Sequence, residues 1–550
     1  MSAPITRREW AVAAALALVV LIVTGIPYLV GYATSAPERV FGGFVIDVED
    51  MHSHLAKMQQ GYRGEWQYRI LFTPEPHAGA YLNTFYIALG HLAQLAQLDL
   101  VVAFHAARLV FGLIFLLTVY AFVSMFLSEP VERRLAYVLV CFSSGLGWLA
   151  VLLAGSFRVG GITPVDFWLI EMYGYFVVMT FPHICLVLAL LLLTFGLALR
   201  YLETGRRRFV VGAALGGLVI SLIHAFLILL VVLVPFATWL LEYLRGRASL
   251  RRLPGLFIMW LLPLPIVVYQ YLAITNNPVL AGWQAQNLTL SPPPWHYALG
   301  YGLVLILALP GAAWALRQAG RWPLLLLWLL IVAPLLYAPS VFPLQRRMIE
   351  GVQVPLCVLA AVGVTRHVLP WVARSRSSHP ANALGDDVVA RHTRRRVGLV
   401  RTLLVALTLP STLIVLLSAT LVAAAGQADT AHRADEVVAV DWLATHSAPA
   451  AVVWASYAVG SYIPARSGRR VVLGHWTETV DLADKRSATS RFFGTADDDE
   501  RRALLNRYGV DYVFYGPRER ALGTFDPAGV GYLEPVFRAG DVTIYRVTLE

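Results

Sequence analysis

The strongest constraint on the fold of this chain is a series of eleven apolar stretches separated by short polar or basic segments. In order along the chain they cover residues 10–30, 101–127, 135–154, 181–201, 209–223, 226–244, 256–272, 297–315, 324–337, 352–368 and 402–424. A helix rises about 1.5 Å per residue, so it needs roughly 20 apolar residues to cross a hydrocarbon layer about 30 Å thick. The sequence therefore predicts an α-helical polytopic membrane protein with about eleven spanning helices.

The composition excludes a soluble fold for the whole chain. Of its 550 residues, 58% are hydrophobic and 14% are charged, whereas a soluble domain carries about 25% charged residues. The net charge of +10 comes largely from basic clusters between apolar stretches, at 206–208, 245–252 and 391–401. Such clusters are typical of cytoplasmic anchors at an anionic membrane surface, so we expect no nucleic-acid partner.

The basic clusters also predict the topology of the chain. Placing the N-terminus in the cytoplasm puts every cluster inside, together with a loop at 369–401. The loops at 31–99, 155–180, 274–296 and 338–351 then lie outside, in a multi-pass protein of the plasma membrane. An odd number of spans also places everything after residue 426 outside.

The tail at 427–550 returns to a soluble composition. Strand-like runs at 451–455, 471–473, 510–515 and 542–547 alternate with helical patterns at 434–445, 482–493 and 498–508. We therefore expect two domains, a transmembrane domain over 1–426 and an extracytoplasmic α/β domain over 427–550.

The first outer loop carries three carboxylates within four positions, Asp47, Glu49 and Asp50. From Asp50 onward the spacing is helical, with three apolar residues recurring at i, i+4 and i+7 and with Asp50, His54 and Lys57 on an adjacent polar face. This pattern predicts a helix that lies on the membrane surface with its titratable groups aligned.

Several short motifs follow in a characteristic order. The first outer loop continues with Gly-Tyr-Arg-Gly-Glu-Trp at 61–66, Thr-Pro-Glu-Pro-His at 73–77 and Phe-His-Ala-Ala-Arg-Leu at 104–109. The second outer loop contains Pro-Val-Asp-Phe-Trp at 164–168, and Phe-Pro-Leu-Gln-Arg-Arg-Met at 342–348 precedes a later span.

This order resembles the GT-C superfamily of membrane glycosyltransferases, in particular the protein O-mannosyltransferases and the lipid A aminoarabinose transferases. By this resemblance the chain is similar to glycosyltransferase family 39. The tail, with Trp454, Tyr457 and Gly460, is more faintly similar to the soluble domain of the oligosaccharyltransferase catalytic subunit. It lacks that family's two adjacent tryptophans and acidic residue. The resemblance implies transfer of a sugar from a polyprenyl-phosphate donor to a lipid, glycan or protein acceptor on the extracytoplasmic side.

Sugar transfer to a hydroxyl requires a carboxylate that takes the acceptor's proton. Asp50 is the first candidate for this base, with Asp47 and Glu49 as alternates and His54 and Lys57 as supporting residues. The competing interpretation is a hydrated acidic loop without catalytic function.

The leaving group would be an anionic lipid phosphate, which a bidentate guanidinium binds well. Arg346 and Arg347 are predicted to bind it, because they lie outside in this topology whereas membrane anchors favour the cytoplasmic side. His224 is added to this donor-phosphate set and His183 is a further supporting residue. A neutral histidine at a helix end is the simpler interpretation of both histidines.

Asp166 and Glu171 in the second outer loop are candidate ligands for Mg²⁺ or Mn²⁺, since hard cations prefer oxygen ligands. Metal-independent members of the superfamily exist, so metal-dependent and metal-independent transfer both stay open.

Two other function classes compete with the enzyme. A transporter or flippase of lipid-linked saccharide would also need many helices, but such proteins concentrate ionisable groups at the membrane midplane, where this chain has few. A noncatalytic membrane protein of the cell envelope could bind glycan through its tail, by stacking sugars on Trp454, Tyr457, Tyr462, His475 or Trp476. A place in the core of a strand is the simpler interpretation of Trp454.

Overall fold

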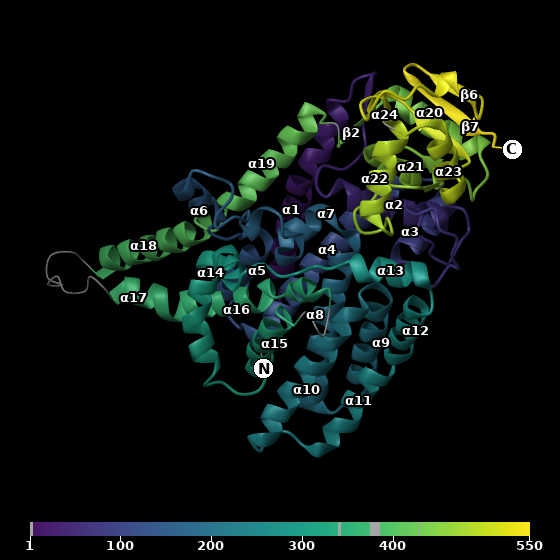
Figure 1. Ribbon diagram of the computed structural model, residues 1–550. Coiled ribbons are helices and arrows are strands. Elements are labelled where there is room, and N and C mark those ends of the chain that lie inside the picture. Colours follow the sequence, from purple (N-terminus) through teal and green to yellow (C-terminus); the bar gives the residue numbers. More distant parts are fainter. Residues whose placement is uncertain (1–3, 339–342, 375–385, 428, 495, 550) are drawn as a thin grey trace. The chain divides into compact units, whose positions relative to one another are not determined.

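The computed structural model describes residues 4–338, 343–374, 386–427, 429–494 and 496–549, without the side chains of 374 and 386–393. It is mostly helical, and its one larger sheet is formed by residues near the C-terminal end (Figure 1). Of the loop predicted at 369–401, residues 375–385 lie outside the described part, as do residues 339–342 just before the predicted arginine pair.

All eleven predicted spans coincide with helices. Seven segments of the described chain are long and apolar enough to cross a membrane by length and composition. They are α1 (Arg7–Ala33), α4 (Leu100–Phe126), α8 (Pro182–Thr204), Ala225–Leu244 with α10 (Ile228–Leu244), Leu250–Thr275 with α11 (Leu253–Leu261) and α12 (Leu264–Thr275), α14 (Pro294–Ala315), and Gln345–Ala373 with α16 (Gln353–Gly363) and α17 (Leu369–Arg374).

The four other predicted spans are bent or short. Two bent pairs pass the same test, α5 (Pro130–Phe142) with α6 (Gly147–Ala154) at 49°, and the end of α18 (Asp386–Ala406) with α19 (Pro410–Ala425) at 45°. The two short helices are α9 (Arg207–Ile223), with 17 residues, and α15 (Trp322–Leu335), with 14. The described residues thus hold seven to nine candidate spans rather than eleven, and the chain is an integral membrane protein.

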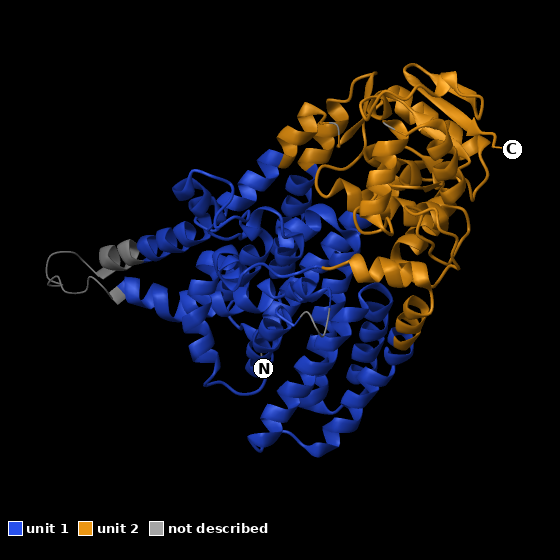
Figure 2. Ribbon diagram, in the orientation of Figure 1, with its two compact units in different colours: residues 1–25, 107–267, 289–418 blue, residues 26–106, 268–288, 419–550 orange. Residues whose placement is uncertain are grey.

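The chain folds into two compact units, which are described separately (Figure 2). Unit 1 comprises residues 1–25, 107–267 and 289–418, and unit 2 comprises residues 26–106, 268–288 and 419–550. The tail thus packs in one unit with the whole of the first loop at 31–99. The predicted domain boundary at 426 stays a prediction.

Unit 1 is organised around α16, whose residues are all buried. It packs against α14, α5 and α15, and small residues let two of these helices approach closely. A Cβ on Gly311 of α14 would lie 1.9 Å from the Leu359 carbonyl oxygen, and one on Gly363 would lie 2.0 Å from that of Leu307. Larger side chains at either glycine would push α14 and α16 apart.

The second outer loop of unit 1 is built from short elements. They are η1 (Val165–Phe167), η2 (Ile170–Met172) and α7 (Gly174–Thr180), and another short helix, η5 (Gln345–Ile349), precedes α16. The packing of η2, which carries Glu171, against η5 brings this loop next to the arginine pair Arg346 and Arg347.

Unit 2 contains a five-stranded sheet in the order β4-β3-β5-β7-β6. Its strands are β3 (Val452–Trp454), β4 (Arg470–Val471), β5 (Tyr512–Tyr515), β6 (Leu533–Ala539) and β7 (Val542–Val547). The first three in space run parallel, whereas β7 pairs antiparallel with β5 and with β6. Helices α20 (Ala434–His446), α21 (Tyr457–Ser467), α22 (Leu482–Phe493), α23 (Asp498–Tyr508) and α24 (Pro517–Arg520) complete this α/β part. The predicted α/β fold of the tail is therefore confirmed.

Helix α2 (Val48–Tyr62) is the predicted amphipathic helix and begins within the acidic triplet, and it packs against α3 (Thr84–Ala96) and α21. Its apolar residues Met51, Leu55 and Met58 are buried, as the spacing indicated. A Cβ on Gly61 would lie 2.0 Å from the Ile87 carbonyl oxygen, so α2 and α3 touch through their backbones. A two-stranded sheet, β1 (Arg39–Phe41) with β2 (Ala431–Arg433), also joins the first loop to the tail.

Candidate functional site

The acidic triplet lies at the N-terminus of α2, within unit 2. Asp47 is the N-cap residue and has a left-handed backbone (φ 53°), while Glu49 and Asp50 lie in the first turn. The unpaired backbone N–H groups of a first helical turn favour negative charge, which stabilises carboxylates at these positions. The helix start therefore holds these acids in a fixed place.

Asp50 contacts a histidine that is 425 residues later in the sequence. The Nε2 atom of His475 lies 3.2 Å from Oδ1 of Asp50. The Asp50 side chain is 24% exposed, whereas that of His475 is 2% exposed. Asp50 is thus a partly accessible carboxylate held by a buried imidazole.

His475 belongs to a tight turn over 474–479 that follows β4. Thr479 Oγ1 accepts hydrogen bonds from the backbone N–H groups of Gly474 and His475, each at 3.1 Å. The turn also lies directly on α21, because a Cβ on Gly474 would be 2.2 Å from the Gly460 carbonyl oxygen. Only glycine permits this close approach, which fixes the position of the imidazole.

Glu49 is engaged by a second residue from the tail. The Tyr457 hydroxyl donates a 2.7 Å hydrogen bond to Glu49 Oε2, and the Arg486 guanidinium lies 4.6 Å from the Tyr457 ring centre. Burial and the neighbouring Glu49 carboxylate raise the pKa of Tyr457 well above its usual range, so this phenol acts as a donor. One oxygen of Glu49 is therefore occupied by the hydrogen bond from Tyr457, the first residue of α21.

The supporting residues Lys57 and His54 are less accessible than a membrane-surface helix would suggest. Lys57 is 4% exposed and pairs with Glu478, and the His54 ring stacks on Tyr86 with ring centres 4.1 Å apart. Burial alone would raise the pKa of Glu478, but the Lys57 ammonium and the hydrogen bonds to the carboxylate outweigh burial and hold that pKa below its ordinary value. The pair therefore anchors α2 to the turn at 474–479.

Arg346 and Arg347 lie on η5 in unit 1. The Arg346 backbone N–H donates to the Thr289 carbonyl oxygen at 3.2 Å, and its guanidinium lies 5.0 Å from the Trp168 ring centre. Stacking on an aromatic ring holds a guanidinium in a defined plane while leaving its N–H edge for an anion. Glu171, 8% exposed, is on η2, which packs against η5.

The two predicted histidines lie next to each other in unit 1. His183 is in the first turn of α8, and His224 is the C-cap residue of α9. Their ring centres are 5.0 Å apart, and His224 Nδ1 lies 3.1 Å from Oε2 of Glu350. Glu350 directly follows η5, so the same stretch of chain carries both arginines and the partner of His224.

Asp166 makes a structural contact. Its Oδ2 accepts a 2.9 Å hydrogen bond from the Gly147 N–H at the start of α6. Burial raises its pKa to about 6, although hydrogen bonds from Ser411 and Gly147 act in the opposite direction. In the described part of the chain, no three His, Cys, Asp or Glu side chains are grouped so that they could hold a metal. The Mg²⁺ or Mn²⁺ site at Asp166 and Glu171 therefore stays a prediction, and Asp166 already accepts the hydrogen bond from Gly147.

The structure brings the predicted residues together in two groups. In unit 2, Glu49, Asp50 and Lys57 meet Tyr457, His475 and Glu478 of the tail. In unit 1, the η5 arginines lie beside the turn with Glu171 and beside the contact between His224 and Glu350. The sequence offered Tyr457 and His475 only as sugar-stacking residues and missed Glu478. The local signal for His475 and Glu478 was a polar Gly-His-Trp-Thr-Glu-Thr segment at 474–479 after a predicted strand.

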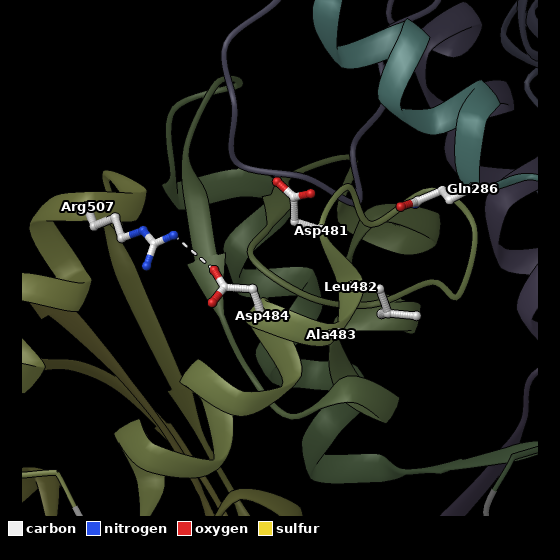
Figure 3. Close-up of a pocket in the computed structure, with 6 residues that line it drawn as sticks. All are labelled: Gln286, Asp481, Leu482, Ala483, Asp484 and Arg507. Carbon is white, nitrogen blue, oxygen red and sulfur yellow. Dashed lines mark hydrogen bonds and ion pairs between the residues drawn. The ribbon is translucent and has the colours of Figure 1, made fainter.

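Unit 2 also contains an open pocket of about 600 Å³ (Figure 3). Its lining residues are Gln286, Asp481, Leu482, Ala483, Asp484 and Arg507. Gln286 Nε2 donates to the Thr477 and Thr479 carbonyl oxygens at 2.6 and 2.7 Å, and Arg507 pairs with Asp484 at 2.9 Å. One side chain of the pocket thus contacts the same turn that carries His475.

Comparison with solved structures identifies the fold. The apo form of the oligosaccharyltransferase from Archaeoglobus fulgidus matches with a TM-score of 0.50 and 13% identity, over 92% of this chain and 69% of that chain. ArnT from Cupriavidus metallidurans bound to undecaprenyl phosphate matches with a TM-score of 0.48 and 14% identity, over 96% of this chain and 97% of that chain. Arabinofuranosyltransferase AftD from Mycobacteria matches with a TM-score of 0.49 and 15% identity, over 100% of this chain and 40% of that chain. No protein-family model matches the sequence, and no curated protein is significantly similar to it.

At these identities, similarity describes the fold and not the activity. We base the assignment on the oligosaccharyltransferase, because the TM-scores of the other two proteins are below 0.5. The predicted resemblance and fold class are confirmed: the chain has the fold of the GT-C membrane glycosyltransferases, with an α/β region near its C-terminal end.

Proposed function

We propose that this chain is a membrane glycosyltransferase that moves a sugar from a polyprenyl-phosphate-linked donor to a hydroxyl of an extracytoplasmic lipid, glycan or protein. The observation that carries the proposal is the Asp50 carboxylate, which is partly exposed at the start of α2 and is held by His475. The fold supports it, since the similar oligosaccharyltransferase is by name a sugar-transferring enzyme.

In the proposed reaction, the acceptor oxygen attacks the anomeric carbon of the donor sugar while the bond from that carbon to the phosphate oxygen breaks. The electron pair of the broken bond leaves with the polyprenyl phosphate. Asp50 takes the acceptor's proton, because a carboxylate within hydrogen-bond reach of a hydroxyl serves as a general base. Asp47 and Glu49 are alternates, but the bond from Tyr457 already occupies Glu49.

Arg346 and Arg347 are proposed to bind the donor phosphate. A guanidinium offers paired N–H donors to phosphate oxygens and stabilises the charge that develops as the glycosidic bond breaks. Trp168 orients Arg346 from one side. His224 contacts Glu350, and the His183 ring contacts the His224 ring. We therefore propose that both histidines support the segment of Arg346, Arg347 and Glu350 and take no part in the chemical step.

A test uses the purified full-length protein in liposomes that contain undecaprenyl phosphate linked to radiolabelled mannose, glucose or aminoarabinose, or decaprenyl phosphate linked to labelled arabinose. A lipid and glycan extract of cell envelopes supplies acceptors. The proposal predicts release of polyprenyl phosphate and transfer of label from at least one donor. Movement of labelled donor between leaflets without any transfer would favour a flippase and contradict the enzyme. Liposomes without protein are the control.

A further inference from the structure

The His475 ring binds different partners through its two nitrogens. Nδ1 lies 3.1 Å from the Thr477 backbone N–H nitrogen and 3.2 Å from that of Glu478. A backbone N–H can only donate, so Nδ1 must present a lone pair to both groups. The hydrogen bonds thus assign the neutral tautomer with its proton on Nε2. Nε2–H then donates to Asp50 Oδ1.

The surroundings of the ring fit this assignment. His475 is 1% exposed and lies against Phe72, with ring centres 5.3 Å apart. The charged or titratable groups near it are Asp50 and His52 on α2 and Glu478 on its own turn. Burial lowers the pKa of His52 to about 3, so His52 stays uncharged beside the pair. Asp50 is therefore the anion that the Nε2–H contacts directly.

The turn at 474–479 has bonds of its own that do not involve Nε2. Thr479 Oγ1 accepts from two backbone N–H groups, and Thr479 N–H donates to the His475 carbonyl oxygen at 3.0 Å. Gln286 binds two further carbonyl groups of the turn. The Nε2–H group adds nothing to the turn itself, and its partner is on another element, helix α2.

We propose that His475 is a positioning residue for Asp50, an inference that rests on the proposed function. The backbone of the turn fixes the tautomer, and the Nε2–H bond holds the Asp50 carboxylate in its ionised form and in one orientation toward the acceptor hydroxyl. The tail thus supplies the residue that prepares the base, although the base itself is on the first loop. Donation to the charged form of a carboxylate favours that form.

Two substitutions separate this role from a purely structural one. In His475→Asn, the amide oxygen can replace Nδ1 as the acceptor of the turn, but the side chain is too short to reach Asp50. In His475→Gln, the amide nitrogen can reach the place of Nε2 and donate to Asp50, but no acceptor remains for the turn. A positioning role predicts that His475→Asn lowers kcat roughly 10- to 100-fold at unchanged donor KM, while His475→Gln keeps most of the activity.

The pH profile gives a second readout in the same assay. Without the Nε2–H donor, protonation of the Asp50 carboxylate becomes easier, so the acid limb of kcat moves to higher pH in His475→Asn and stays in place in His475→Gln. Activity retained in His475→Asn, or lost equally in both variants, would overturn the proposal. Wild-type protein that consumes no donor would instead contradict the proposed function.

A measurement that needs no activity decides the hydrogen bond independently. Solid-state NMR of the full-length protein in bilayers, with ¹⁵N-labelled histidine, assigns the His475 signals by their loss in His475→Asn. We expect a protonated Nε2, an unprotonated Nδ1, and an Nε2 signal that shifts in Asp50→Asn. A proton on Nδ1, or no response to Asp50→Asn, would show that the pair is not formed and would overturn the proposal.

Discussion

Lys57 and Glu478 form a buried ion pair, with Nζ 2.8 Å from Oε1 and both side chains 5% exposed. Ser53 Oγ donates to the same oxygen at 2.6 Å, and the Tyr68 hydroxyl donates to the other oxygen at 3.0 Å. Because the carboxylate has donors on both oxygens, its buried charge is compensated by protein groups. This pair fixes helix α2 to the turn that carries His475.

Lys57→Met should destabilise unit 2 strongly, because it leaves the Glu478 charge buried without its partner. Removal of one member of a buried pair costs about 3–5 kcal/mol. The double variant Lys57→Met with Glu478→Gln should recover much of this loss. Thermal unfolding in detergent measures both changes, with the exposed Arg546→Met as a control that should change little. An additive double variant would show that the two residues are not coupled.

Gly474→Ala should displace the turn at 474–479. Its Cβ would lie 2.2 Å from the Gly460 carbonyl oxygen, so the turn or α21 must move and His475 moves with it. We expect a lower melting temperature together with a loss of sugar transfer. Gly531→Ala is the matched control, because nothing lies within 4 Å of its added Cβ. Equal behaviour of the two variants would contradict the close packing.

Asp166→Asn should stabilise the protein at neutral pH. Burial raises the Asp166 pKa from 3.8 to about 6, so between these values the folded state binds more protons than the unfolded state. Stability therefore falls as pH rises through this window, by about 3 kcal/mol once both states are ionised. Asparagine can keep the bond to the Gly147 N–H without the buried charge.

Melting temperatures at pH 4 and pH 7.5 test whether the buried Asp166 carboxylate lowers stability as pH rises. The gain from Asp166→Asn should be present at pH 7.5 and small at pH 4, while the exposed Asp499→Asn should show no such difference. A variant that is less stable than wild type at both pH values would show that the Asp166 carboxylate is stabilised, not strained, by its surroundings.

Arg346→Gln should raise the donor KM roughly 10- to 100-fold, because it removes the proposed charged contact with the lipid phosphate. Arg346→Lys should recover only part of this loss, since an ammonium group lacks the bidentate geometry and the stacking on Trp168. Initial rates against donor concentration measure both variants. Arg158→Gln, at an exposed position of the second outer loop, is the control. An unchanged KM in Arg346→Gln would remove Arg346 from the donor site.

The fold could be predicted where local pattern decides it. Each apolar stretch became a helix, and the buried Met51, Leu55 and Met58 followed from helical spacing. Helix α21 was missed because Gly460 and Pro464 are poor helix formers, and its conformation depends on packing against the turn at 474–479. Strand β6 was missed because Pro535 and a register shift interrupt its pattern.

The candidate site could be predicted only in part, because its contacts join residues that are far apart in the sequence. The acids at the start of α2 are visible as a cluster, but no local signal links Asp50 to a histidine 425 residues away. Lys57 was expected on a polar face, and it is buried because its partner Glu478 comes from the tail. The topology of the loops and the roles of the site residues stay predictions.

The most direct test of the account is the rate of donor consumption by Asp50→Asn in the liposome assay. Asparagine keeps the size of the side chain and removes the base, so we expect transfer to fall roughly 10²- to 10⁴-fold while the donor KM stays within a few fold. The exposed Asp499→Asn should behave like wild type. Sugar transfer by Asp50→Asn at the wild-type rate would contradict the assignment of Asp50 as the base.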